Sequence, residues 1–343
     1  MTGHGVPGLP AVPPPGPPSR RVLLVGATGT IGRATAEALV RHGHPVVAFV
    51  RPPPPDVRGP RPTRWPPGVT LRTGDVTDPV SLRKDGFQGE PFDAVVSCMA
   101  SRTGAPEDAW AIDHRAHLTL LEAAKEMGVS HFVLLSAICV QKPKLEFQRA
   151  KLAFEEELMG SGLTWSIVRP TAFFKSISGQ VARVMRGKPF LLLGDGALTA
   201  CKPISDGDLA EYLAGCLTDP ERQGRVLPIG GPGEAITPRE QGEHLFALLG
   251  QAPRFRRVPV AVLHAVAGVL GGLARIFPPL EAKAEFARIG KYYATESMLV
   301  WDAEAGRYDA EATPSFGEET LFDHYARLVR GDAVEERGDH SVF

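Results

Sequence analysis

Short apolar runs rich in β-branched residues alternate with amphipathic segments along most of the chain from Arg21 onward. Such alternation is typical of a parallel sheet with helices on both faces. The segments 31–43 and 114–128 have helical periodicity, and Gly128 follows the second as a helix-ending residue. The six runs that predict strands are 21–26, 45–50, 69–74, 92–98, 131–137 and 164–170. We predict an α/β fold with a doubly wound, parallel Rossmann sheet.

The alternation weakens after Pro170. Helices are predicted over 175–186, 206–217 and 238–249, and they form a smaller, mostly helical C-terminal part. The Pro-rich span 52–67 cannot be a helix or a central strand, so it predicts a long loop after the second strand. That loop leaves the carboxyl edge of the sheet, where ligands bind in this architecture.

Three glycines mark the junction between the first strand and the first helix. In VGATGTIG, Gly26 allows a tight turn, Gly29 lets a pyrophosphate approach the backbone, and Gly32 brings helix and strand together. The N–H groups at the start of that helix then face the phosphates. An ordinary glycine-rich turn is the alternative. The predicted dinucleotide-binding residues of this loop are Gly26, Thr28, Gly29, Thr30, Ile31 and Gly32.

Arg51 ends the second strand, at the position where NAD-binding proteins of this fold carry an acidic residue for the ribose hydroxyls. A guanidinium is permanently charged and pairs with phosphate oxygens, so Arg51 favours the 2′-phosphate of NADPH. A plain surface arginine, or a role shared with Arg33, is the alternative. We therefore expect NADPH as the cofactor.

Later strand ends supply the rest of the predicted cofactor site by topology. Asp75 and Val76 follow the third strand, where this fold lines the adenine pocket, although Asp75 could equally cap its own turn. The other strand-end positions predicted to contact the cofactor are Ser97, Arg169, Pro170 and Thr171.

The fifth strand leads into LLSAICVQKPKLEFQRAK, which resembles the short-chain dehydrogenase superfamily with one departure. That superfamily pairs a tyrosine with a lysine four residues later, and here the pair is Phe147 and Lys151, on one helix face. The resemblance implies that Lys151 and the strand-end Ser136 contact the cofactor, and a solvated helix lysine is the alternative. Because phenylalanine donates no proton, carbonyl reduction through a tyrosinate is disfavoured.

Four strings carry a closer resemblance. Together with the tyrosine-less FQRAK, the strings GATGTIG, LSAICVQKP, IVRPTAFFKS and YYATESMLV resemble the 8-vinyl reductases of divinyl chlorophyllide or protochlorophyllide, an atypical branch of that superfamily. The resemblance covers 21–328. It implies NADPH-dependent reduction of a vinyl group to ethyl on a flat, largely apolar pigment, in chlorophyll or bacteriochlorophyll synthesis.

Vinyl reduction is consistent with the missing tyrosine, because hydride addition leaves charge in the macrocycle rather than on an oxygen. A slower proton donor can then complete the reaction. The candidate donors are Lys151, Tyr292 and Tyr293, and the two tyrosines are also expected as pocket walls. The predicted pigment contacts are Phe147, Phe173 and Phe174, although residues at such spacing are often plain core.

The chain is expected to comprise a disordered Pro-rich tail (1–19), an NADPH-binding Rossmann domain (20–172), a substrate-binding part that partly returns to the sheet (173–330) and a C-terminal tail (331–343). The first tail lacks the features of a signal or transit peptide. The apolar segment 259–277 contains His264 and three glycines, which predicts a buried or surface-lying helix with at most peripheral membrane contact.

Composition narrows the partners. Thirty-eight Lys and Arg against 39 Asp and Glu leave no basic excess for nucleic acid. Four scattered cysteines without a CxxC pair predict reduced core thiols and no metal site. The reduced thiols predict a cytoplasmic protein, and the apolar pigment implied by the resemblance suggests work near a photosynthetic membrane. Richness in Ala, Arg, Gly and Pro, with the short N-terminal tail, suggests a bacterium and therefore bacteriochlorophyll synthesis. Oligomeric state is not indicated.

Two other functions fit the same domain. An isoflavone-reductase-like enzyme acting on a small phenolic shares the glycine spacing and a lysine without the tyrosine. A non-catalytic, NmrA-like redox sensor or assembly factor could bind NADP through the same residues. NADPH binding without pigment-dependent oxidation would indicate the sensor.

Overall fold

The computed structural model describes residues 18–52, 65–274, 277 and 280–332. Most of the two predicted tails and most of the Pro-rich loop at 52–67 lie outside the described residues. The core of the molecule is a parallel sheet with strand order β3-β2-β1-β4-β5-β6-β8. Its strands are β1 (Val22–Val25), β2 (Val46–Val50), β3 (Val69–Thr73), β4 (Ala94–Ser97), β5 (His131–Leu135), β6 (Thr164–Pro170) and β8 (Arg225–Ile229).

All six predicted strands are confirmed, and the doubly wound topology with them. The chain starts mid-sheet, winds outward through β2 and β3, and then crosses back to β4 beside β1. The strand order therefore reverses between the paired strands β1 and β4, and their carboxyl ends mark the switch point at which this architecture binds ligands. The seventh strand, β8, was not predicted, because it is a half-exposed edge strand containing Pro228 rather than a continuous apolar run.

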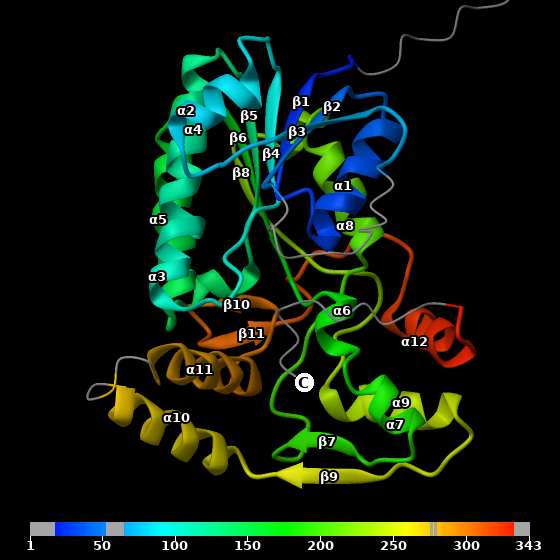
Figure 1. The fold of residues 1–343 in the computed structure, drawn as a ribbon. Helices are drawn as coiled ribbons and strands as arrows, with labels where there is room; N and C mark the ends of the chain where they lie inside the picture. The colour runs from blue at the N-terminus through cyan, green and yellow to red at the C-terminus, as the bar shows by residue number, and fades with distance from the viewer. Residues whose placement is uncertain (1–17, 53–64, 275–276, 278–279, 333–343) are drawn as a thin grey trace, which may run out of the picture.

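Helices cover both faces of the sheet (Figure 1). On one face α1 (Thr30–Arg41) packs against α8 (Asp206–Gly215). The other face carries α4 (His117–Glu126) and α5 (Glu146–Met159). The short helical pieces of this half are α2 (Pro79–Ser81), η1 (Leu82–Phe87), α3 (Pro106–Ala109), η2 (Trp110–Ala116), η3 (Ile138–Gln141) and η4 (Pro220–Arg222). Each face buries its own apolar cluster, which fixes the strand ends between them.

The helix predicted over 114–128 is longer than expected. It begins at Pro106 as α3, passes through the π-helical stretch η2, and continues as α4 to Glu126. A π-helical turn widens the hydrogen-bonding ring by one residue and often lies at a functional site. Here it carries Asp113 inward.

The C-terminal part lies beyond the carboxyl edge of the sheet (Figure 1). Its elements are α6 (Phe174–Ile177), α7 (Val181–Met185), β7 (Phe190–Leu193), α9 (Pro238–Leu248), β9 (Phe255–Val258), α10 (Val260–Ala274), α11 (Glu281–Thr295), β10 (Val300–Asp302), β11 (Arg307–Asp309) and α12 (Leu321–Arg330). β7 pairs with β9 and β10 with β11, in two small sheets. The predicted helices at 206–217 and 238–249 are confirmed as α8 and α9.

The single helix predicted over 175–186 is wrong. Two short helices, α6 and α7, occupy this range, because the Ser178 hydroxyl donates to the Phe174 carbonyl (2.6 Å) and the Gln180 side chain bonds the backbone of Leu191 in β7. The segment predicted as a buried or surface-lying helix forms α10, and Ala267 is its one buried residue. Among the described residues, no helix is long and apolar enough to cross a bilayer.

Candidate cofactor and substrate site

The glycine turn between β1 and α1 has the geometry that its spacing predicts. Gly26 has φ +75°, and a Cβ there would lie 2.4 Å from the Cys98 carbonyl carbon. A Cβ on Gly32 would lie 2.2 Å from the Gly26 oxygen. Gly29 is the N-cap of α1, with no side-chain cap and no acidic residue in the first turn. The backbone N–H groups at the start of α1 can therefore bind an anion such as a phosphate. The predicted contacts Thr28, Thr30 and Ile31 lie beside them.

The three predicted contacts for the adenosine end differ in exposure and in their hydrogen bonds. Arg51 is exposed at the end of β2. Asp75 instead caps its own turn, since Asp75 Oδ1 accepts from the Thr77 N–H (2.8 Å) and the Thr77 hydroxyl (2.7 Å). Val76 is buried. The alternative role considered for Asp75 is thus present in the structure, and a cofactor contact from Asp75 or Val76 stays a prediction.

Ser97 is fully buried at the end of β4, and its hydroxyl lies 2.8 Å from His117 Nε2. His117 Nδ1 lies 2.9 Å from the Ile112 carbonyl oxygen, which requires the proton on Nδ1. Burial, with the nearby Lys151 ammonium, lowers the pKa of His117 to about 4. The Ser97 hydroxyl therefore donates to a neutral histidine, and a cofactor contact from Ser97 stays a prediction.

Lys151 is anchored by a carboxylate that the sequence did not indicate. Lys151 Nζ lies 2.9 Å from Asp113 Oδ1, and the Lys151 side chain is 11% exposed while that of Asp113 is wholly buried. Asp113 Oδ1 also accepts from the Ser101 N–H (3.2 Å), which follows β4. The alternative of a solvated helix lysine does not describe this side chain, because its ammonium lies in a buried ion pair.

Ser136 and Arg169 meet at a second buried carboxylate, Glu155. The Ser136 hydroxyl donates to Glu155 Oε1, and Arg169 pairs with the same carboxylate. Glu155 stands one helical turn after Lys151 in α5, and that i+4 spacing is a sequence signal that could have found it. We call Ser97, Asp113, His117, Ser136, Lys151, Glu155 and Arg169 the strand-end cluster.

Pro170 and Thr171 lie at the end of β6, where they fasten the chain rather than face open space. Pro170 is buried, the Thr171 hydroxyl donates to the Lys202 carbonyl, and the Thr171 N–H donates to Ile229 of β8 (2.9 Å). Their predicted contacts with the nicotinamide stay predictions.

Two of the strings that carried the sequence resemblance, 135–143 and 292–300, lie against each other. The Tyr292 hydroxyl donates to the Cys139 (2.9 Å) and Lys142 (3.2 Å) carbonyls. Glu296 accepts from Lys142 (2.6 Å), from Lys144 and from Tyr308 (2.6 Å), and these donors outweigh burial and lower its pKa to about 2.

Further bonds complete this contact. Gln141 donates to the Leu299 carbonyl and accepts from the Trp301 N–H (2.9 Å). We call Gln141, Lys142, Lys144, Tyr292, Glu296, Trp301 and Tyr308 the clamp. It fixes the loop that follows β5, directly after Ser136.

The predicted pigment contacts are only partly brought together. Phe147 is half-buried against a cluster that contains Ile138 and Tyr292. Phe174 belongs instead to a separate core with Tyr325, and Phe173 packs against the core on the α1 face of the sheet. Tyr293 is 37% exposed, with its hydroxyl 4.0 Å from Cys139 Sγ. Phe147 and Tyr293 share one region, whereas Phe173 and Phe174 lie elsewhere.

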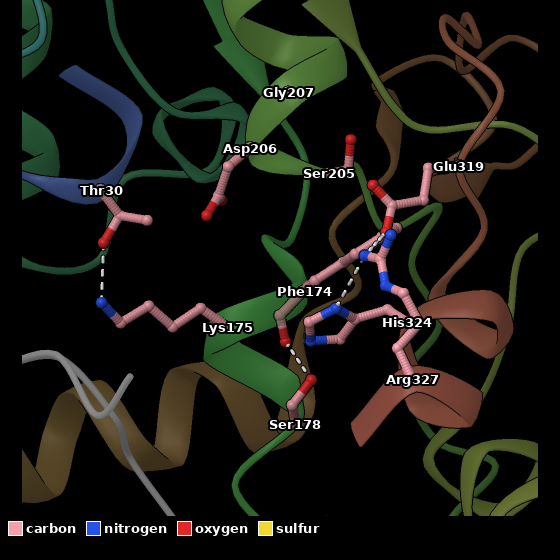
Figure 2. A pocket seen from close by; sticks show the side chains of 10 residues that line it. All are labelled: Thr30, Phe174, Lys175, Ser178, Ser205, Asp206, Gly207, Glu319, His324 and Arg327. Carbon is pink, nitrogen blue, oxygen red and sulfur yellow. Dashed lines mark hydrogen bonds and ion pairs between the residues drawn. The ribbon is translucent and has the colours of Figure 1, made fainter. Parts of the chain in front are cut away.

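A cavity of about 230 Å³ lies beside the glycine turn, lined from α1, α6, α8 and α12 (Figure 2). Small-ligand sites occupy about 300–1,000 Å³, so this cavity alone does not accommodate a tetrapyrrole. It adjoins the phosphate end of the predicted cofactor site, because Thr30 lines it.

Comparison with known proteins agrees with this geometry. A family model described as NAD(P)H-binding matches residues 26–220. The chain is 50% identical over 340 residues to the chloroplastic divinyl chlorophyllide a 8-vinyl-reductase of Oryza sativa subsp. indica, covering 95% of this chain and 83% of the relative. The Arabidopsis thaliana protein of the same name is 49% identical over 335 residues, covering 94% and 80%. This chain belongs to the divinyl chlorophyllide a 8-vinyl-reductase family.

Membership of this family confirms the resemblance predicted from the sequence. Among solved structures, the leucoanthocyanidin reductase of Vitis vinifera, in a binary complex with NADPH, has a TM-score of 0.65 at 18% identity, covering 90% of this chain and 99% of that chain. That likeness shows the shared fold, including its C-terminal part.

The expectation of a bacterial, cytoplasmic protein is wrong. The two relatives of this family described above are plant enzymes named as chloroplastic. Bulk composition sets charge and solubility and does not encode a compartment, which is why richness in Ala, Arg, Gly and Pro misled. Bacteriochlorophyll as the end product has no support either, since these relatives are plant proteins.

Proposed function

We propose that this protein uses NADPH to reduce the 8-vinyl group of divinyl chlorophyllide to ethyl, in chlorophyll biosynthesis. The observation that carries the proposal is identity of about half the residues, over 95% of the chain, with a reductase of that name. The site is compatible with it, since Lys151 is anchored in a cluster with the strand ends while Phe147 replaces the superfamily's tyrosine.

NADPH rather than NADH is favoured by Arg51. Its exposed guanidinium follows β2, at the edge where the adenosine ribose of a bound dinucleotide lies in this fold. No carboxylate occupies that position, so a 2′-phosphate meets attraction instead of repulsion. Replacing Arg51 with Glu should reverse the preference, which paired titrations with NADPH and NADH would measure.

The cofactor supplies a hydride when bound, and the protein's task is orientation and proton supply. Hydride reaches the terminal vinyl carbon, the electron pair enters the macrocycle, and one proton then adds to the inner carbon. Lys151, held by Asp113, is the proposed contact to the nicotinamide ribose and a candidate proton donor.

The two tyrosines differ as donors. Tyr292 is committed to two backbone carbonyls, whereas the Tyr293 hydroxyl makes one long contact to a thiol. Tyr293 is partly exposed as a residue, but its hydroxyl faces inward toward Cys139, and burial of the hydroxyl groups raises the pKa of both phenols above their ordinary value. We therefore favour Lys151 and Tyr293 as donors and assign Tyr292 to the clamp.

The deciding experiment mixes the purified protein, NADPH and divinyl chlorophyllide and follows the nicotinamide absorbance together with the pigment's Soret band. A blue shift with matching NADPH oxidation is expected, because one double bond leaves conjugation. Monovinyl chlorophyllide is the matched control and should give neither change. Intact NADPH binding with no pigment-dependent oxidation would overturn the proposal in favour of a non-catalytic NADP-binding protein.

Peripheral membrane contact is also proposed, on the surface of α10. Val262, Val266, Val269 and Leu273 are spaced as one helix face and are 40–62% exposed. Arg256 and Arg257 of β9, just before the helix, are exposed as well, and cations beside an apolar face favour an anionic lipid surface. Val266→Glu with Val269→Glu should abolish co-flotation with phosphatidylglycerol-containing vesicles; binding that survives both changes would refute this contact.

A further inference from the structure

Lys175 reaches from α6, in the C-terminal part, to the first residue of α1. Its Nζ donates to Thr30 Oγ1 at 2.7 Å, across the edge of the cavity beside the glycine turn (Figure 2). Lys175 and Thr30 are 145 positions apart in the sequence. The contact therefore joins α6 of the C-terminal part to the start of α1, where the phosphates of a dinucleotide are expected.

The electrostatics of this contact are unusual. A helix N terminus carries partial positive charge, and cations are stabilising at the opposite end of a helix. Lys175 nevertheless places an ammonium beside the start of α1, which has neither a side-chain cap nor an acidic residue in its first turn. The Lys175 ammonium and the positive N terminus of α1 are thus close together, and an anion bound between them would stabilise both.

The cavity is also lined by acidic side chains. Asp206 and Glu319 line the same cavity, and Glu319 is paired with Arg327 (Figure 2). No ion pair joins Lys175 to a carboxylate in the part of the chain that the structure describes. The Thr30 hydroxyl accepts from Lys175, and its own hydrogen remains able to donate to a phosphate oxygen.

We propose that Lys175 binds the pyrophosphate of the dinucleotide, together with the Thr30 hydroxyl and the N terminus of α1. This inference rests on the proposed function only in its choice of a nicotinamide dinucleotide as ligand. Because Lys175 belongs to α6, pyrophosphate binding also holds that helix against α1. α6 contributes Phe174 to the core of the C-terminal part, so cofactor binding orders the junction between the two halves.

The test compares Lys175→Met with Lys188→Met, an exposed lysine of the same part, by fluorescence titration with NADPH. We expect a rise in Kd of about 10- to 100-fold for Lys175→Met, the range for a lost charge-assisted contact, and no change for Lys188→Met. Lys175→Arg, which keeps the charge, should recover most of the affinity.

A second ligand locates the contact. The 2′-phosphorylated form of ADP-ribose contains the pyrophosphate but no nicotinamide, so Lys175→Met should weaken its binding by the same factor. A loss confined to NADPH would place Lys175 at the nicotinamide and overturn the proposal, as would unchanged affinity for both ligands.

The unfolding temperature measured without ligand provides a second test, in which Lys175→Met is not expected to be harmful. If Lys175 and the N terminus of α1 repel each other, Lys175→Met should unfold at the same or a higher temperature in the absence of NADPH and gain less from adding it. A marked fall in unfolding temperature without ligand would instead assign Lys175 a structural role. Neither readout needs the pigment, so these results are independent of whether vinyl reduction occurs.

Discussion

The strand-end cluster includes Ser136 and the clamp holds the loop that directly follows it, and the two groups use buried charge in different ways. In the strand-end cluster, Asp113 and Glu155 are fully buried and pair with Lys151 and Arg169, whose side chains are 11% and 19% exposed. In the clamp, one buried carboxylate, Glu296, holds Lys142 and Lys144, which are 26% and 54% exposed.

This difference indicates that one region serves the chemistry of the site and the other serves the stability of the fold. The strand-end cluster comes from β4, β5, β6 and the helices between them, so its geometry is set within the sheet. The clamp fastens the loop after β5 to residues near the end of the chain. We expect changes in the first to alter chemistry and changes in the second to alter mainly stability.

The largest expected effect is on turnover in Lys151→Met. Loss of a positioned proton donor lowers rates by about 10²–10⁴-fold. The matched clamp variant Lys144→Met should change turnover less than about fivefold, because an exposed ion pair contributes at most about 1 kcal/mol. Steady-state kinetics with divinyl chlorophyllide would measure both. Since Lys151→Met leaves Asp113 unpaired, thermal unfolding must show that the variant is folded, and turnover preserved with only weaker NADPH binding would exclude a donor role.

Acid should disrupt the two regions in different pH windows. The folded-state pKa of His117, about 4, lies below its ordinary 6.5, so the unfolded chain binds the proton more readily. Stability is then fully present above pH 6.5 and falls as pH drops toward 4, by about 3 kcal/mol for a shift of this size.

Glu296 accounts for the loss of stability that is expected at lower pH. Its pKa is about 2 against an ordinary 4.5, so its contribution is present above pH 4.5 and is lost as pH falls toward 2. Urea unfolding at stepped pH would separate the two. If His117→Gln leaves the loss between pH 6.5 and 4 unchanged, the histidine is not its source.

Glu296→Gln should destabilise the fold by about 2–3 kcal/mol, because two lysines and Tyr308 lose a buried charged acceptor. Turnover should fall much less than in Lys151→Met, since the strand-end cluster is untouched. Glu304→Gln, an exposed carboxylate just past β10, is the control and should be neutral. Equal losses of stability in both variants would contradict the clamp.

The smallest effect distinguishes the adjacent tyrosines. Tyr292→Phe leaves the Cys139 and Lys142 carbonyls without their donor and should cost about 1–2 kcal/mol of stability with little change in turnover. Tyr293→Phe should have the reverse pattern if Tyr293 donates the proton. A Tyr292→Phe enzyme that folds normally but turns over slowly would return Tyr292 to the catalytic candidates.

Local patterns predicted the sheet and its glycine turn because both depend on short-range constraints. Apolar runs identify central strands, and Gly32 is required by its contact with Gly26 inside one βα unit. Gly26 follows from its position in the glycine spacing, although the backbone that it approaches is that of Cys98 after β4. β8 escaped because an edge strand has no such run. The break between α6 and α7 escaped because it depends on Gln180 bonding to β7, which the sequence does not reveal.

The charged partners of the site were harder to predict than its backbone. Glu155 follows Lys151 at helical spacing and was within reach of the sequence. Asp113 was not, because the π-helical stretch η2 shifts the helix phase before it meets α5. Glu296 sits inside a string that was used for recognition, yet its contact with Lys142 crosses 154 positions. Side chains that meet only through tertiary contacts show no periodic spacing in the sequence.

The span of the clamp has a consequence for synthesis on the ribosome. Strands β1 to β6 are complete once about half the chain has emerged, and N-terminal units generally fold first. The loop after β5 must wait for Glu296 and Tyr308, so it is unsecured while most of the remaining chain is translated. The glycine turn of β1 and α1 can therefore form early in synthesis, whereas the clamp is among the last contacts that a nascent chain can make.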